Sequence, residues 1–336
     1  MIIVKSPFRI SYFGGGTDFP IWFENNDGGR VISTTINKYC YVFLRVLPPF
    51  FSFNYRLRYY ETELANNIKD IKHPSIKCIL EEYYKKKGGL EIIHWADIPA
   101  LSGLGASSSF SCSLIKGIFE LNNKKISKQQ LAQKSVYIEK NLLGEAGGLQ
   151  DQYAISHGGF NEIIFNKKKI TVQKLKISED KKKLLEDFTT IFFTGISRKA
   201  NDIENKKINL FFKKKNYYEE ILNICKEAKN IFSNNDKKYF ISEIAELLNL
   251  SWSLKKNLSS EVSSHFIDQI YSGGMKNGAI AGKILGAGGG GFILFLSKDK
   301  FEKKKLIKYL NKLKYVNIKF ENLGTRIINK DIHEYI

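Results

Sequence analysis

The sequence predicts a protein of mixed helices and strands, built either as two domains or as one large α/β unit. A chain of 336 residues is long for a single core. Strand-like segments fill its first third, whereas helical periodicity dominates from about residue 199 to residue 271. Two glycine-rich segments, PALSGLGASSS and LGAGGGGF, lie in different halves of the chain. We place the domain boundary near Leu175, with residues 1–175 before it and 176–336 after it.

The first half alternates strand patterns with amphipathic helices. β-Branched and aromatic residues are dense in the expected strands, which span Ile2 to Ser11, Val31 to Val46, Asn54 to Tyr60 and Leu90 to Trp95. Apolar residues recur at helical spacing in the expected helices, which span residues 74–87, 110–121 and 131–142. Residues 158–165 and 170–175 have the pattern of a β-hairpin.

After residue 187 the pattern becomes strand, long helical region, strand, helix, strand. We expect strands at Thr189 to Thr194, Phe292 to Leu296 and Val316 to Glu321, and helices from about residue 199 to 271. A last helix is expected at Asp299 to Leu313, with Ser297 as its N-terminal cap.

The strongly basic balance raises the question of a polyanionic partner. The net charge of +19 arises from 53 Lys and Arg against 34 Asp and Glu. The lysines, however, fall in scattered triplets, and no nucleic-acid module is recognisable in the sequence. We therefore interpret them as solvated surface charges and expect no nucleic-acid partner.

The cysteines and histidines indicate neither disulfides nor a zinc site, because their spacing matches no ligand motif. The N-terminus MIIVKSPFRIS lacks the apolar region of a signal peptide, and no apolar run approaches the ~20 residues of a membrane helix. We expect a reduced, cytoplasmic protein with no membrane partner. The oligomeric state is left open, with a homodimer as the assembly to test.

The stretch Gly286 to Gly291 formally contains G-x-G-x-x-G, but its context argues against a dinucleotide-binding turn. That turn follows a strand and opens a helix, whereas here an apolar strand follows the glycines. A flexible linker would not be joined directly to such a strand. We interpret the segment as a loop whose missing Cβ atoms let another group approach closely, with Gly288 and Gly289 at its centre.

The segment PALSGLGASSS lies between an expected strand and an expected helix, the order that anion binding requires. Glycines let backbone N–H groups crowd a phosphate, and the helix N-terminus adds unpaired donors. The residues concerned are Gly103, Leu104, Gly105, Ala106, Ser107 and Ser108. An ordinary helix cap with additional serines is the alternative. The segment is not a P-loop, because G-x-x-x-x-G-K-[ST] is absent.

Two further segments carry charged side chains next to glycines. Glu139 lies on an amphipathic helix and Asp151 emerges from a glycine loop twelve residues later. Such a pair could hold Mg²⁺ and accept a proton in phosphoryl transfer, although isolated carboxylates are more often solvated. In PFRISYFGGGTD, Arg9 precedes the turn of Gly14, Gly15, Gly16, Thr17 and Asp18. A hairpin turn with an exposed arginine is the alternative there.

These segments together resemble the GHMP kinases, the superfamily of galacto-, homoserine-, mevalonate- and phosphomevalonate kinases. PFRISYFGGGTD, PALSGLGASSS and LGAGGGGF correspond in order to its three signature regions and extend from Pro7 to Phe292. GGGTD, STTINKY and GGLQDQYA most resemble sugar kinases that act on D-glycero-D-manno-heptose 7-phosphate. The turn departs from the GEHTDY of galactokinases, and Arg9 stands where mevalonate kinases have Lys.

The resemblance implies an α+β fold, with an N-terminal domain like domain 2 of ribosomal protein S5 and a ferredoxin-like C-terminal domain. ATP and a sugar phosphate would meet between them. The implied roles are phosphate binding for residues 103–108, Mg²⁺ ligation for Ser107 and Glu139, and proton acceptance for Asp151. Arg9 would stabilise transferring charge, and Asp18 would bind a sugar hydroxyl. Ala106 departs from a common Ser, which shifts its hydroxyl role to Ser107 or Ser108.

The expected activity is therefore ATP- and Mg²⁺-dependent phosphorylation of the anomeric hydroxyl of a heptose 7-phosphate. A phosphorylated sugar needs a second anion site, and Arg198, at the start of an expected helix, is the candidate. A surface Arg at a helix start is the alternative. Fucose or another hexose as substrate, and an inactive sugar- or nucleotide-binding regulator, are the other functions to consider.

Overall fold

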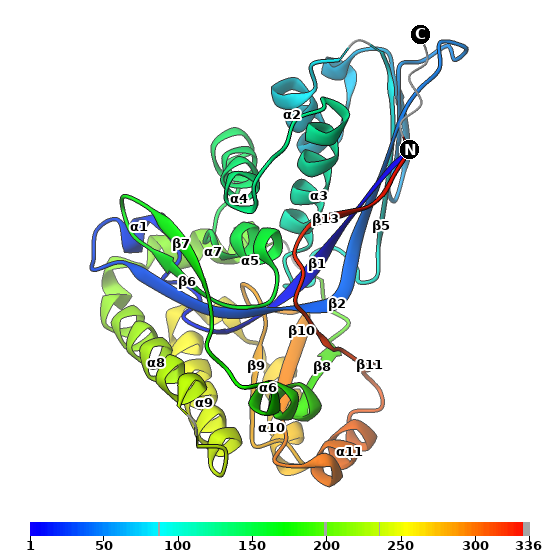
Figure 1. The fold of residues 1–336 in the computed structure, drawn as a ribbon. Coiled ribbons are helices and arrows are strands. Elements are labelled where there is room, and N and C mark those ends of the chain that lie inside the picture. Colours follow the sequence, from blue (N-terminus) through cyan, green and yellow to red (C-terminus); the bar gives the residue numbers. More distant parts are fainter. Residues whose placement is uncertain (87, 198–199, 235, 332–336) are drawn as a thin grey trace.

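The computed structural model describes residues 1–86, 88–197, 200–234 and 236–331, in which two β-sheets are each covered by helices. Figure 1 shows the larger sheet, with its long strands β1 (Ile2–Phe13) and β2 (Gly29–Val46), in the upper part of the molecule. The smaller sheet lies below it and closer to helices of the second half of the chain.

The larger sheet is organised around β2, which pairs with strands from both ends of the chain. Its main strand order is β13-β1-β2-β5-β3-β4, and β2 also pairs with β12 and β6. All pairs are antiparallel except β3 with β5, which is parallel. The remaining strands are β3 (Tyr55–Arg58), β4 (Thr62–Ala65), β5 (Leu90–Ala96), β6 (Phe160–Phe165), β7 (Ile170–Lys174), β12 (Phe320–Glu321) and β13 (Arg326–Lys330).

Helices of the first half pack on one side of this sheet (Figure 1). The core helix α3 (Ala106–Leu121) lies against β1 and β2 so closely that a Cβ at Gly117 would come within 2.1 Å of the Leu44 side chain. The other helices of this half are α1 (Pro20–Phe23), α2 (Pro74–Tyr83), α4 (Lys128–Val136) and α5 (Gln150–His157), with a 3₁₀ turn at Ile68–Asp70 and a π-helical turn at Tyr137–Leu142.

The smaller sheet is antiparallel, in the order β11-β8-β10-β9. Its strands are β8 (Thr189–Phe193), β9 (Ala281–Ile284), β10 (Phe292–Leu296) and β11 (Lys314–Val316). Every residue of β9 and β10 is buried, so both faces are covered. The helices of this half are α6 (Glu179–Phe188), α7 (Ala200–Asn209), α8 (Lys215–Ser233), α9 (Phe240–Leu258), α10 (His265–Lys276) and α11 (Lys300–Tyr309), with 3₁₀ turns at Phe212–Lys214 and Ser260–Val262.

The last strands return to the first sheet. Glu321 in β12 pairs with Thr35 in β2, and Ile327 in β13 pairs with Val4 in β1. The C-terminal segment thus crosses from the smaller sheet to the larger one. The domain boundary near Leu175 stays a prediction. Strands β12 and β13, although they lie after this boundary in the sequence, belong to the larger sheet of the first half.

Several element predictions need correction. The helix from residue 74 ends at Tyr83, and the strand expected at Val316 to Glu321 is two short strands in different sheets. The cap of α11 is Asp299, which accepts a hydrogen bond from the Glu302 amide, and not Ser297, which is buried. Asp299 was expected as the first helical residue, and the helix begins one position later, at Lys300.

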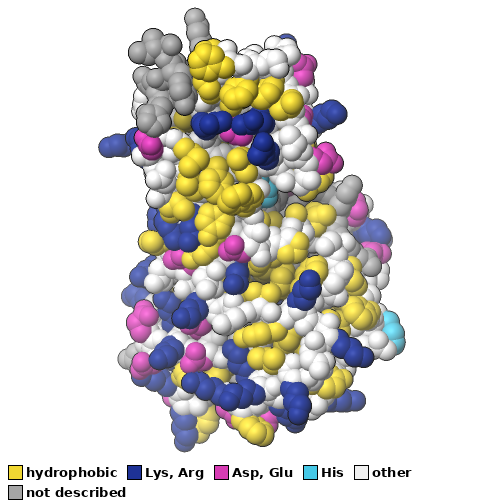
Figure 2. All heavy atoms as spheres, turned by 90° about the vertical axis from the view of Figure 1, so that its right-hand side faces the viewer, with side chains coloured by type: hydrophobic (Ala, Val, Ile, Leu, Met, Phe, Trp, Pro, Cys, Tyr) yellow, Lys and Arg dark blue, Asp and Glu magenta, His cyan; other side chains and the backbone are white. Residues whose placement is uncertain are grey.

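The lysines outside the core are dispersed. On the face drawn in Figure 2, basic side chains are interspersed with acidic and apolar ones over most of the surface and do not form one continuous patch. Within the described ranges, none of the helices combines the length and apolar character that a bilayer crossing requires.

Candidate active site

A cavity of about 350 Å³ lies where the glycine-rich segments of both halves meet. Its walls come from the turn after β1, the loop before α3, the N-terminus of α5 and the loop between β9 and β10. Among its lining residues are Arg9, Asp18, Ser107, Glu139 and Asp151. The cavity therefore brings Arg9 and Asp18 together with Glu139 and Asp151, which follow them by more than a hundred positions in the sequence.

The two glycine-rich segments touch through their backbones. A Cβ at Gly286 would lie 2.6 Å from the Cα of Gly103, and a Cβ at Gly291 would lie 2.3 Å from the Ser102 carbonyl oxygen. The Phe292 amide donates to the same Ser102 oxygen at 3.2 Å. Side chains at these glycines would force the loops apart. The predicted close approach is thus made by backbone. Gly286 and Gly291 meet the loop before α3, and a Cβ at the predicted position Gly288 would lie 2.8 Å from the Val262 carbonyl oxygen.

Gly105 caps the N-terminus of α3 and places residues 103–108 beside the charged groups. It has φ +82°, a conformation that favours glycine. A Cβ there would lie 3.2 Å from the Asp151 carboxylate and 3.4 Å from the Arg9 side chain. Ser107 is exposed to the cavity in the first helical turn. Unpaired backbone donors at the start of this 16-residue helix can bind phosphate oxygens.

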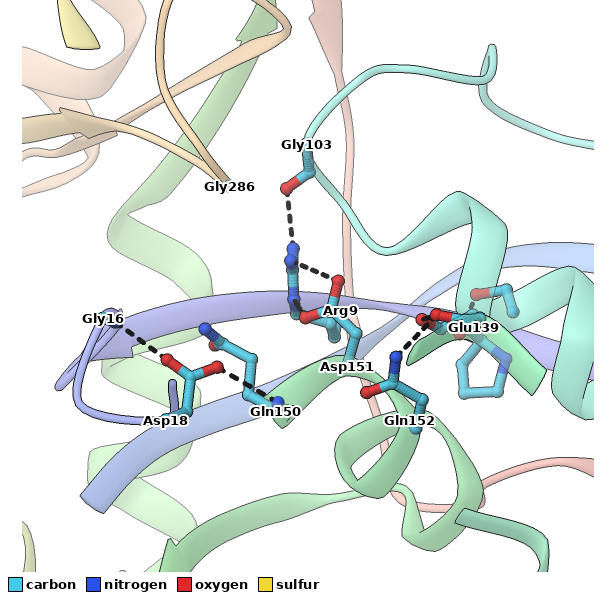
Figure 3. A network of polar contacts seen from close by, with 12 residues as sticks. Arg9, Gly16, Asp18, Gly103, Glu139, Gln150, Asp151, Gln152 and Gly286 are labelled. Atoms are coloured by element: carbon cyan, nitrogen blue, oxygen red, sulfur yellow. Dashed lines mark hydrogen bonds and ion pairs between the residues drawn. The ribbon is translucent and has the colours of Figure 1, made fainter. Parts of the chain in front are cut away.

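Arg9 and Asp151 form a bidentate ion pair at the centre of the site. Arg9 Nε and Nη2 donate to the two Asp151 carboxylate oxygens, each at 2.7 Å, and Nη1 donates to the Gly103 carbonyl at 2.6 Å. Figure 3 shows this guanidinium between Gly103 and Asp151. The Arg9 side chain is 5% exposed and that of Asp151 is 22% exposed, so the carboxylate is the more accessible partner of the pair. The two parallel hydrogen bonds from Arg9 fix the orientation of this carboxylate.

Three consecutive residues at the N-terminus of α5 connect three parts of the site (Figure 3). The Gln150 amide donates to Asp18, the Asp151 side chain pairs with Arg9, and the Gln152 side chain donates to Glu139 at 2.6 Å. Asp151 is thus in the first turn of a helix and not in the glycine loop that the sequence predicted. The first turn of α5 therefore carries Asp151 and also contacts the carboxylates of Asp18 and Glu139.

Glu139 lies on the π-helical turn that continues α4. Its carboxylate accepts hydrogen bonds from the Ser108 hydroxyl at 2.9 Å, from Ser135 at 3.2 Å and from Gln152. Burial, and secondarily the charge of Glu145, raise the pKa of Glu139 to about 7, although the hydrogen bonds from Ser108 and Gln152 act in the opposite direction. One turn of π-helix in an α-helix is frequent at functional sites, and here it carries the buried carboxylate.

These oxygens fit a Mg²⁺ ion, which prefers carboxylate and hydroxyl ligands. Glu139 and Ser107 line the same cavity, and a cation there would compensate a carboxylate that burial otherwise disfavours. Among the described residues no cluster of three His, Cys, Asp or Glu side chains could hold a metal. The remaining ligands would have to be phosphate oxygens and water. The serine in contact with Glu139 is Ser108, whereas Ser107 faces the cavity.

Asp18 is enclosed by backbone. It accepts from the Gly16 amide at 2.8 Å and from the Gln150 amide at 3.1 Å, and a Cβ at Gly148 would overlap its carboxylate. Burial raises its pKa above the usual range, although both amide hydrogen bonds act in the opposite direction. Gly148 is therefore required for Asp18 to reach its position at the cavity.

The other predicted site residues divide into those at the cavity surface and those behind it. Gly15, Gly16 and Gly288 line the cavity with the phosphate-loop residues. Thr17 instead donates to the carbonyls of Gly14 and Arg30 and stabilises the turn from behind. Leu104 is fully buried and Gly289 donates to the Val262 carbonyl. Arg198 lies outside the described residues.

Several lining residues were missed by sequence reasoning. Three lysines, Lys207, Lys255 and Lys283, reach the cavity from α7, α9 and β9. They are three of many lysines in the chain, and no local sequence pattern distinguishes them from surface lysines. Two histidines, His73 and His94, line the apolar end of the cavity. Only tertiary structure brings these residues together.

Sequence comparison decides the family. The profile of the GHMP kinases N terminal domain matches residues 71–159, and that of the GHMP kinases C terminal domain matches residues 237–316. The D-glycero-alpha-D-manno-heptose 7-phosphate kinase of Campylobacter jejuni is 32% identical over 320 residues, which cover 93% of each chain. This chain belongs to the GHMP kinase family. The resemblance deduced from the three signature segments is therefore confirmed.

Solved structures agree with a GHMP kinase fold over nearly the whole chain. A D-glycero-D-manno-heptose 1-phosphate kinase from Bacteroides thetaiotaomicron superposes with a TM-score of 0.78 at 22% identity, covering 98% of this GHMP kinase and all of that chain. A putative sugar kinase from Campylobacter jejuni gives a TM-score of 0.75 at 28% identity, with 97% of each chain covered. The predicted two-domain α+β architecture of this family is also confirmed.

Proposed function

We propose that this GHMP kinase transfers the γ-phosphoryl group of ATP to the anomeric hydroxyl of D-glycero-D-manno-heptose 7-phosphate, giving the 1,7-bisphosphate. The observation that carries the proposal is the full-length similarity to a heptose 7-phosphate kinase, combined with an ion-paired carboxylate beside a phosphate-binding loop. The product would serve nucleotide-activated heptose and surface polysaccharide synthesis, in the cytoplasm.

The chemistry would centre on Asp151. In this mechanism its carboxylate takes the proton of the anomeric hydroxyl while the sugar oxygen forms a bond to the γ-phosphorus. The bond from that phosphorus to the bridging oxygen of the β-phosphate breaks, and ADP leaves. The bidentate contact with Arg9 supports this role because it aims the carboxylate at the cavity. The same guanidinium, bonded to Gly103, would stabilise charge near the phosphate loop.

The nucleotide phosphates would bind residues 103–108 at the start of α3, with Glu139 and Ser107 as the protein ligands of Mg²⁺. A bound Mg²⁺ ion would neutralise phosphate charge. We assign the base of ATP to the apolar end of the cavity, where the His94 ring lies 4.8 Å from Phe110. Burial lowers the pKa of His94 to about 4, so its ring is neutral at physiological pH and suits a flat, uncharged partner.

The sugar would lie on the Asp18 side of Asp151, against Gly15 and Gly16. Asp18 is held rigidly by two amides, which supports the role of a fixed acceptor for a sugar hydroxyl. Arg198 remains a predicted phosphate ligand. A homodimer likewise remains a prediction.

The test is ADP release with a panel of sugars at fixed ATP and Mg²⁺. We expect kcat/KM for D-glycero-D-manno-heptose 7-phosphate to exceed that for L-fucose, galactose, mannose and unphosphorylated heptose by at least ~100-fold, as loss of charge-assisted contacts would produce. Preference for L-fucose or a free hexose would replace the proposed substrate. No ADP release with any sugar, despite ATP binding, would favour an inactive regulator.

A further inference from the structure

Three lysine ammonium groups converge on the wall between the glycine loop and the turn after β1. Lys255 Nζ donates to the carbonyls of Ile284 and Gly286 at 3.1 and 2.6 Å, and Lys207 Nζ donates to the next carbonyl, that of Ala287, at 2.6 Å. Lys283 Nζ donates to the Tyr12 carbonyl at 2.7 Å. All three lysines line the cavity.

These cations have little negative charge to balance them. Lys207 lies 3.2 Å from Glu204, but among the described residues no carboxylate forms an ion pair with Lys255 or Lys283. Burial lowers the pKa of Lys283 to about 7, and the charge of Arg9 acts in the same direction. Burial and the charges of Lys283 and Lys207 likewise lower the pKa of Lys255. The three lysines therefore form a buried group of basic side chains beside a single described ion-pair partner, Glu204, and a bound anion would favour their charged forms.

The cluster lies on the sugar side of the site. Tyr12, whose carbonyl accepts from Lys283, lies in β1 two positions before Gly14, the first residue of the turn that contains Asp18. Glu204, beside Lys207, lies against Gly147, and the adjacent Gly148 lies against Asp18. Glu139 is on the opposite side of Asp151 (Figure 3). An anion bound by the lysines would thus be separated from the predicted metal position by the reacting carboxylate.

We propose that Lys207, Lys255 and Lys283 form the binding site for the phosphate monoester that the sugar substrate already carries. This inference rests on the proposed function, because it assigns residues to the phosphate of that substrate. A phosphate dianion has enough acceptor oxygens for all three ammonium groups and, being an anion, would compete with the neutral backbone carbonyls that they contact at 2.6–3.1 Å. Such an anion would give the three ammonium groups a charged partner, which the neutral backbone carbonyls do not supply.

A structural role is the competing explanation, since the same lysines hold the carbonyls of residues 284–287. Lys255→Gln separates the two explanations because glutamine removes the charge but keeps an N–H donor, on a side chain one bond shorter, that can replace part of the contact with the loop carbonyls. Lys207→Met removes charge and donor together. Lys303→Met is the matched control: Lys303 is also partly buried, also has a lowered pKa and donates to the carbonyls of Asp187 and Thr189, but it does not line the cavity.

The experiment measures KM for ATP and for D-glycero-D-manno-heptose 7-phosphate, and calorimetric binding of the heptose 7-phosphate without ATP. We expect Lys255→Gln and Lys207→Met to raise KM and Kd for the sugar phosphate about 10- to 100-fold. KM for ATP should change less than about threefold, and Lys303→Met should leave all three constants unchanged. The melting temperature of each variant reports whether its fold is intact.

Equal increases in KM for ATP and sugar would overturn the site and assign the lysines to the nucleotide. Unchanged sugar binding in both variants, with a wild-type enzyme that requires the 7-phosphate, would overturn the site but leave the proposed function. A wild-type enzyme that uses unphosphorylated heptose equally well would overturn the proposed function itself. The three failures are therefore distinguishable in one set of proteins.

Discussion

Replacement of Asp151 by Asn removes the proposed base and one half of a buried ion pair while preserving side-chain shape. General-base assistance is worth ~10² to 10⁴ in rate, which corresponds to about 2.7 to 5.5 kcal/mol of activation free energy. We expect kcat to fall by that factor. Nucleotide affinity should be retained. The proposed phosphate ligands include backbone N–H groups of residues 103–108, and the substitution of the Asp151 side chain does not remove them.

The same substitution should also destabilise the fold. Arg9 is 5% exposed and would lose a carboxylate that accepts two 2.7 Å hydrogen bonds. Breaking a fully buried pair costs about 3–5 kcal/mol. Asp151 is 22% exposed, asparagine can still accept one hydrogen bond, and Arg9 keeps its bond to Gly103. We therefore expect a loss of about 1.5–3 kcal/mol in the free energy of unfolding.

The assay combines steady-state kinetics, ATP binding by calorimetry and urea unfolding. The double variant Arg9→Met with Asp151→Asn is the internal control, because removing both partners relieves the unpaired charge. It should recover much of the lost stability but none of the activity. Wild-type turnover in Asp151→Asn, at saturating substrate and with the protein fully folded, would refute the assignment of Asp151 as the base.

The remaining predictions concern the glycine loop, the metal and pH. Gly286→Ala should reduce kcat/KM for ATP at least ~10-fold more than Gly144→Ala. Both glycines have φ near +65°, but only at Gly286 would the added Cβ collide with the backbone of Gly103. Equal losses would show that the backbone conformation alone matters. Glu139→Gln and Ser107→Ala should each raise the Mg²⁺ concentration for half-maximal activity about 10- to 100-fold; unchanged titrations in both would move the metal elsewhere. Lys283 has a pKa lowered from 10.5 to about 7, so the unfolded chain binds more protons between these values and the free energy of unfolding should rise with pH across that window. Lys283→Met should reduce this rise in urea unfolding at pH 7 and pH 9, and identical slopes would contradict it.

The sequence predicted the parts of the site that lie in contiguous signature segments. Arg9, Asp18, Glu139 and Asp151 all line one cavity, as the resemblance implied. Their roles remain predictions. Their mutual contacts could not be deduced, because they depend on α5, a helix of eight residues whose N-terminus was interpreted as a loop. The glycines before it masked the helical pattern that follows.

The limits of the fold prediction have the same origin. Strands β1 and β2 have dense β-branched residues and were predicted almost to their ends, whereas β9, within the sequence GAIAGKI, is too short and glycine-rich to show a pattern. The returning strand β13 has a suitable composition, but its partner β1 lies more than 300 residues away. Long-range pairing of this kind has no local signal. The cavity lysines were missed for the same reason.

The central claim is that this GHMP kinase phosphorylates a sugar that already carries a phosphate, at the anomeric oxygen. The most direct measurement is ³¹P NMR of a reaction containing the purified protein, ATP, Mg²⁺ and D-glycero-D-manno-heptose 7-phosphate. We expect the ATP γ-resonance to disappear and a second sugar phosphate resonance, coupled to the anomeric proton, to appear, while the 7-phosphate resonance persists. A new phosphate on another carbon, or no new sugar phosphate while a free hexose is phosphorylated under the same conditions, would contradict it.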